Sequence, residues 1–92
     1  MKQRAVILAA RLAIARERLD CSSPGDALTL SLRTVAGLGD DSDVARVDRV
    51  LENCRDLLSW RPAFRALHSL KPTLGLERLR SAAAEAKLAV RV

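Results

Sequence analysis

Residues 3–20, QRAVILAARLAIARERLD, decide the fold of this chain, because they contain neither glycine nor proline and consist almost entirely of good helix formers. They predict a long first helix, and all-α is the fold class we expect. At about 100° per residue, this helix carries two apolar stripes on roughly opposite sides. The stripes are Leu8, Leu12, Ala15 and Leu19, and Val6, Ile7, Ala10 and Ile14. A helix with two apolar faces is usually sandwiched, either inside its own bundle or between that bundle and a partner.

The edge between the two apolar stripes is basic. Arg4, Arg11 and Arg18 follow one another at intervals of seven residues, so they share one face of the predicted helix. We call these three residues the arginine edge. It is a candidate contact for an acidic surface, within the chain or across a dimer.

The segment after the first helix predicts a shorter second one. Ser23-Pro24-Gly25-Asp26 is typical of a helix start, and the helix is expected to end near Ala36. Residues 28–33 alternate apolar and polar side chains, as a strand does, so an extended conformation is the alternative there. A lone strand would find no partner in this chain, and we therefore favour helix.

A third, amphipathic helix is predicted from about Asp43 to Ser59. Its apolar side chains recur at alternating three- and four-residue spacing, as in a bundle seam. The seam residues are Val44, Val47, Leu51, Cys54 and Leu58. The acidic cluster at residues 40–43 lacks the glycine and terminal glutamate of a calcium-binding loop, so it is expected to cap this helix.

The opposite side of the third helix is acidic. Asp48, Glu52 and Asp56 lie four residues apart, but they lack the Glu-x-x-His arrangement of helical di-metal sites. We therefore expect a solvated or ion-paired face, which the arginine edge could match, and we predict no metal and no cofactor.

Arg61-Pro62 is expected to break the third helix, and a short fourth helix should run from Pro62 to about Leu70. The two aromatic residues of the chain, Trp60 and Phe64, lie here. We favour a core position for them, because large aromatic side chains dominate burial when few are present. The alternative is an interface anchor beside Arg61 and Arg65.

Residues 71–75 predict a turn, and residues 76–90 a last helix whose basic side chains include Arg78, Arg80 and Lys87. A short helix, a glycine-containing turn and a basic helix fit a helix-turn-helix loosely, so these three residues are the candidates for nucleic-acid contact. The turn is predicted to be long, and the last helix lacks Asn and Gln, which read base edges.

Composition limits the function classes. The 92 residues are 49% hydrophobic but only 2% aromatic, which predicts one domain, residues 1–92, with a thin core that association would complete. The net charge of +5 permits nucleic-acid, lipid or acidic-protein partners without choosing among them.

Cys21 and Cys54 lack metal-ligand spacing and suit free thiols in a reducing compartment. No export signal or membrane-length apolar stretch is evident, so a cytoplasmic location is expected.

These observations predict a compact bundle of four to five helices that acts as a non-enzymatic protein–protein interaction module, such as an adaptor, an inhibitor or a small chaperone-like subunit. Its partner would be another protein or a second copy of the chain, as a homodimer or heterodimer, and no integral membrane segment is expected. The predicted surfaces are the first helix, with Ile7, Ile14 and the arginine edge, and the corner formed by Trp60, Arg61, Phe64 and Arg65. The alternative is a small basic DNA-binding regulator that uses its C-terminal helices. No catalytic arrangement of a base and a nucleophile is visible.

Overall fold

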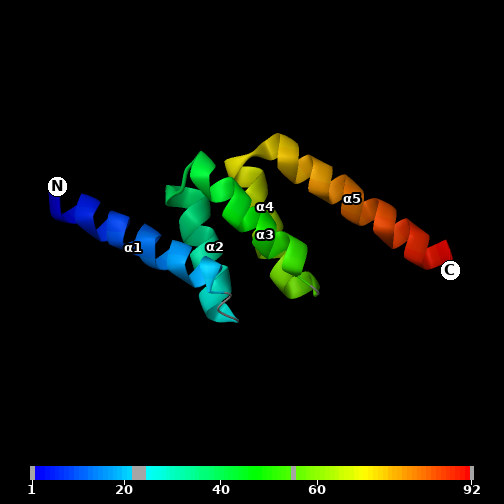
Figure 1. Cartoon of the computed structure of the whole chain (residues 1–92), viewed down its shortest axis with the longest axis horizontal. Helices are drawn as coiled ribbons and strands as arrows, with labels where there is room; N and C mark the ends of the chain where they lie inside the picture. Colours follow the sequence, from blue (N-terminus) through cyan, green and yellow to red (C-terminus); the bar gives the residue numbers. More distant parts are fainter. Residues whose placement is uncertain (1, 22–24, 55, 92) are drawn as a thin grey trace.

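The computed structural model describes residues 2–21, 25–54 and 56–91, with the side chains of residue 2 and residues 87–91 outside that range. Its elements are α1 (Lys2–Asp20), α2 (Asp26–Leu38), the 3-10 turn η1 (Asp41–Asp43), α3 (Val44–Asn53), α4 (Leu57–Leu70) and α5 (Pro72–Arg91) (Figure 1). The prediction of an all-α bundle of four to five helices is confirmed. The described residues contain no strand, and residues 28–33 belong to α2. The predicted cap at Ser23 lies outside the described residues.

The helices from the middle of the sequence form the centre of the bundle. α2 packs against α1 on one side and α4 on the other, and α3 and α5 each pack against α4. The N-terminal half of α1 and the C-terminal half of α5 extend from this centre toward opposite ends of the molecule (Figure 1). The extents of 56 × 26 × 15 Å reflect these two extensions.

The buried core is small and uses short side chains. Its members come from α1 to α4 and are Ala15, Leu19, Leu32, Val35, Val47, Leu51, Ala63, Ala66 and Leu67. From α1, only the C-terminal half reaches the core. The N-terminal half of α1 is therefore held by its own backbone and by few side-chain contacts.

The predicted boundary between the third and fourth helices is wrong. α3 ends at Asn53, and α4 begins at Leu57, so Pro62 lies inside α4 and does not break it. Asp56 caps α4 by accepting a hydrogen bond from the Ser59 N–H at 2.9 Å. Because the first four N–H groups of a helix have no intrahelical partner, a proline this close to the start removes only the bond to the Leu58 carbonyl. Leu58, predicted to lie in the α3 seam, is 87% exposed on α4.

The predicted turn at residues 71–75 is also wrong. Only Lys71 separates α4 from α5, and Pro72 is the first residue of α5. Proline suits this position because its missing N–H would have no partner there and its fixed φ is helical. α5 therefore starts one full turn earlier than its apolar pattern indicated.

Gly75 lets α4 and α5 approach closely. A Cβ atom built on Gly75 would lie 2.9 Å from the His68 Cα and 3.0 Å from its Cβ. We expect Gly75→Ala to lower the free energy of unfolding by about 1–2 kcal/mol, because the overpacking outweighs the helix-propensity gain of alanine. Gly37→Ala is the matched control, since nothing lies within 4 Å of a Cβ there, and should be neutral or stabilise by about 0.5 kcal/mol. Urea unfolding of both variants measures the difference, and equal stabilities would contradict the close approach.

Asp43 joins three elements through its buried carboxylate. The Arg16 side chain of α1 donates two hydrogen bonds to it, both at 2.8 Å, and Arg46 of α3 donates a third at 2.6 Å. The Asp40 N–H donates a fourth at 3.0 Å, and Asp40 in turn caps η1 by accepting from the Ser42 N–H. The acidic cluster was predicted to cap the third helix; its side-chain cap instead belongs to η1, and Asp43 at the N-cap of α3 makes no side-chain cap hydrogen bond. Asp43 in addition ties α1 to the turn and to α3.

Candidate functional site

The two apolar stripes of α1 have different surroundings. In the first stripe, Ala15 and Leu19 are buried and Leu8 and Leu12 are half-buried. In the second stripe Val6 is 67% exposed, Ile7 52% and Ile14 50%, and Ala10 is exposed as well. We call Val6, Ile7, Ala10 and Ile14 the exposed stripe. Among the described residues nothing covers it, so α1 has one face toward its own bundle and one apolar face toward solvent.

The arginine edge borders the exposed stripe. Arg4, Arg11 and Arg18 are all exposed, and none of them forms an ion pair with another residue in the described part of the chain. Along α1 these arginines alternate with Ile7 and Ile14 at three- and four-residue spacing. This face thus presents a line of alternating basic and aliphatic side chains.

The aromatic corner on α4 lies at the boundary of the core. Trp60 and Phe64 are half-buried and stacked, with ring centroids 5.1 Å apart and planes inclined by 3°. Both pack against the core, while Arg61 and Arg65 are exposed on the outer side of the same helix. His68 is also exposed. Trp60 and Phe64 thus contact the core on one side and remain accessible on the other.

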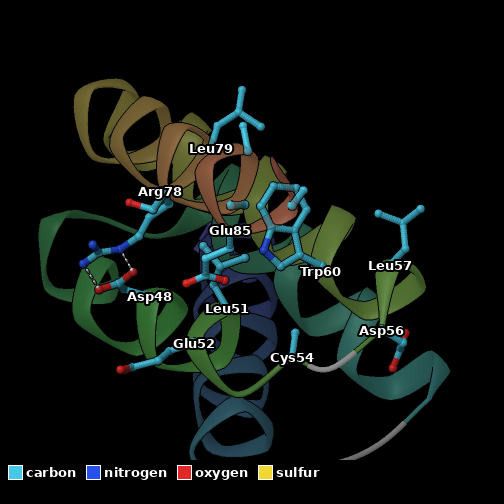
Figure 2. A pocket seen from close by; sticks show the side chains of 14 residues that line it. Asp48, Leu51, Glu52, Cys54, Asp56, Leu57, Trp60, Arg78, Leu79 and Glu85 are labelled. Carbon is cyan, nitrogen blue, oxygen red and sulfur yellow. Dashed lines mark hydrogen bonds and ion pairs between the residues drawn. The ribbon is translucent and has the colours of Figure 1, made fainter. Parts of the chain in front are cut away.

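The open side of Trp60 faces a groove of about 920 Å³ between α3, α4 and α5 that the sequence did not predict. Figure 2 shows the Trp60 ring in the middle of this space, with Glu85 of α5 on one side and Leu57 of α4 on the other. The apolar part of the lining consists of Leu51, Cys54, Leu57, Trp60, Leu79 and the alanines 82, 83 and 86 of α5. We call this feature the α3–α4–α5 groove.

The charged lining of the α3–α4–α5 groove is acidic. Asp48 and Arg78 form a bidentate pair, with Nε–Oδ1 at 2.8 Å and Nη2–Oδ2 at 2.9 Å, and this bond holds the pKa of Asp48 below its ordinary value. Glu52, Asp56 and Glu85 supply three more carboxylates. Among the described lining residues, four carboxylates therefore stand against one guanidinium. An excess of carboxylates attracts a basic ligand.

The predicted contact between the arginine edge and the acidic stripe does not form within one chain. Asp48 pairs with Arg78 of α5 instead. Asp56 is not on α3, because it caps α4. In Figure 1 the N-terminal half of α1 extends away from α3 and α5. The C-terminal end of α1 contacts α3, but the ion pair there joins Asp20 to Arg46 and does not involve Arg18.

The candidate nucleic-acid residues are differently placed. Arg78 is engaged by Asp48, Arg80 is exposed, and the side chain of Lys87 lies outside the described residues. The turn between α4 and α5 is a single residue, contrary to the long turn expected. DNA binding by these residues stays a prediction, although Arg78 would have to leave Asp48 to reach a phosphate.

The remaining reactive side chains do not form a site. The Cys54 thiol donates to the Val50 carbonyl at 3.1 Å, and burial raises its pKa, which disfavours the thiolate. Cys21 is an exposed free thiol. Across residues 2–21, 25–54 and 56–91 no group of three or more His, Cys, Asp or Glu side chains could hold a metal ion. In the same residues, no helix is both long and apolar enough to cross a membrane.

Comparisons of the chain with models of protein families, with curated proteins and with solved structures find no match. The exposed stripe, the arginine edge and the α3–α4–α5 groove are therefore the features from which a function can be inferred.

Proposed function

We propose that this chain is a non-enzymatic protein–protein interaction module that acts by helix-face packing, with the exposed stripe of α1 as its binding face. The observation that carries the proposal is the exposure of Val6, Ile7 and Ile14 on a helix whose other apolar stripe already packs against the bundle. Three large aliphatic side chains on one extended half-helix are typical of a surface that a partner covers.

The position of the exposed stripe supports the same proposal. Residues 3–11 form about two and a half helical turns that precede Leu12, where α1 begins to pack against the core. Isolated helices of this length are marginal in water, because nucleation is costly and tertiary packing supplies most of the stability. A partner that covers the exposed stripe would supply that packing.

The small core supports association as well. Its nine members are three alanines, two valines and four leucines, and a chain of this size buries a smaller share of its surface than a larger domain. Packing the exposed stripe against a second helical surface would extend the core without any change in fold.

Sedimentation of the purified chain over a wide range of protein concentration tests the proposal in its simplest form. We expect a mass above the 10.0 kDa of one chain that rises with concentration. A mass of 10.0 kDa at every concentration would mean that the chain does not bind itself.

A further inference from the structure

We propose that the α3–α4–α5 groove of one copy receives the exposed stripe and arginine edge of α1 from a second copy. The inference rests on the proposed function and adds the identity of the partner and of the receiving surface. It also assigns a role to the groove, which the predicted interaction surfaces did not include.

Charge complementarity points to this occupant. The described residues of the groove lining supply four carboxylates and one guanidinium, whereas residues 3–14 of α1 contain Arg4 and Arg11 and no acidic residue. Arg18 extends the basic line by another two turns. An acidic groove on a chain with a net charge of +5 is thus matched by a basic helix of the same chain.

The apolar chemistry matches as well. The lining of the groove includes Leu51, Trp60, Leu79 and the small side chains of α5. Ile7 and Ile14 lie between the arginines of α1, so aliphatic side chains would meet the apolar lining while guanidinium groups meet the carboxylates. Alanines on α5 allow a second helix to approach closely.

One copy does not place its own α1 in its own groove. The N-terminal half of α1 extends away from α3, α4 and α5, the helices that line the groove (Figure 1). The contact is therefore head-to-tail, and each bound copy leaves one α1 and one groove available. Such heterologous contacts continue until a ring closes, so the assembly can exceed two chains.

Mixing two defective variants tests this inference. Ile7→Asp with Ile14→Asp removes the donor face but leaves the groove intact. Glu52→Arg with Glu85→Arg reverses two exposed charges of the groove but leaves α1 intact. We expect each double variant alone to sediment as one chain. An equimolar mixture should form a complex of two chains, because the first variant supplies a groove and the second supplies an α1.

The control for the groove variant is Asp41→Arg with Glu77→Arg, which reverses two exposed charges outside the groove and should assemble like the wild type. Assembly of the groove variant at the wild-type level, or no complex in the mixture, would overturn the head-to-tail contact. A different result would contradict the proposed function, namely assembly of the Ile7→Asp, Ile14→Asp variant at the wild-type level. A wild-type chain that stays monomeric at all concentrations would show that a second copy does not occupy the α3–α4–α5 groove.

Discussion

Replacing Asp43 with alanine is expected to lower the free energy of unfolding by about 3 kcal/mol, among the largest single-residue effects in this chain. The carboxylate is fully buried and accepts four hydrogen bonds from Arg16, Arg46 and the Asp40 N–H. The variant would leave a cavity and two guanidinium groups without their shared partner. Because both arginines are partly exposed, the expected loss of stability lies at the lower end of the range for broken buried ion pairs. A chain of this size has a total stability of roughly 5–14 kcal/mol, so urea unfolding would resolve the change easily.

Asp41→Ala is the matched control, because Asp41 lies in the same turn with an exposed side chain. It should stay within about 0.5 kcal/mol of the wild type. Equal stabilities of the two variants would show that Asp43 does not join α1, η1 and α3.

Acid unfolding tests the contribution of the Asp43 carboxylate to stability independently. The Arg16 hydrogen bonds hold the pKa of Asp43 below the ordinary value of 3.8. A group whose pKa is lowered by folding contributes its full stability above the unfolded pKa, and this contribution is lost as the pH falls toward the folded pKa. We therefore expect wild-type stability to fall below about pH 4. The free energy of unfolding of Asp43→Asn should fall less steeply over the same pH range. Part of the fall should remain, because the pKa values of Asp20, Asp40 and Asp48 are also lowered in the folded chain.

Replacing both Ile7 and Ile14 with aspartate is expected to weaken self-association by about one to two orders of magnitude. Because each isoleucine is half-exposed in the single chain, its burial at the contact contributes about half of the 1.5–3 kcal/mol of a full burial, and about 1.4 kcal/mol corresponds to a tenfold change in affinity. The new carboxylates would also face an acidic groove. Sedimentation equilibrium measures the change, and the thermal unfolding of the single chain should barely shift because both side chains are half-exposed.

Ala5→Asp with Ala9→Asp is the control for this variant. Both alanines are exposed on the same half of α1 but lie on the side away from Ile7 and Ile14. This control adds the same two negative charges, so it separates the effect of the binding face from that of net charge. If both double variants weakened association equally, charge alone would account for the assembly.

The two-faced character of α1 could be predicted from sequence because it depends only on helical periodicity. Residues 3–20 contain no helix breaker, and the spacing of Leu8, Leu12 and Ile14 assigns each to a stripe before any tertiary contact is known. The structure buries one predicted stripe and exposes the other. Which stripe would be buried was not evident, because both have the same hydrophobic character.

The boundaries near proline were mispredicted for a local reason. Pro62 was interpreted as a break between two helices and Pro72 as part of a turn, but each lies near enough to a helix start that few or no backbone hydrogen bonds are lost. The Asp56 cap, which sets the start of α4, was instead assigned to a charged stripe. A capping residue and a surface acid look alike when the helix start is unknown.

The buried Asp43 and the α3–α4–α5 groove depend on contacts between distant segments. Arg16 lies 27 positions before Asp43, and Arg78 lies 30 positions after Asp48. Periodicity gives the face of a helix on which each side chain lies, but it does not give the helix that this face meets. The acidic stripe was therefore recognised, while its partner within the chain and the groove beside it were not.

Amide hydrogen exchange of residues 3–14, compared between dilute and concentrated protein, tests the exposed stripe as the binding face most directly. We predict fast exchange in the dilute chain, because this half-helix has few tertiary contacts, and strong slowing at high concentration. The Ile7→Asp, Ile14→Asp variant should exchange fast at both concentrations. Unchanged exchange of residues 3–14 in a wild-type sample whose mass has risen would place the interface elsewhere and contradict the role of α1.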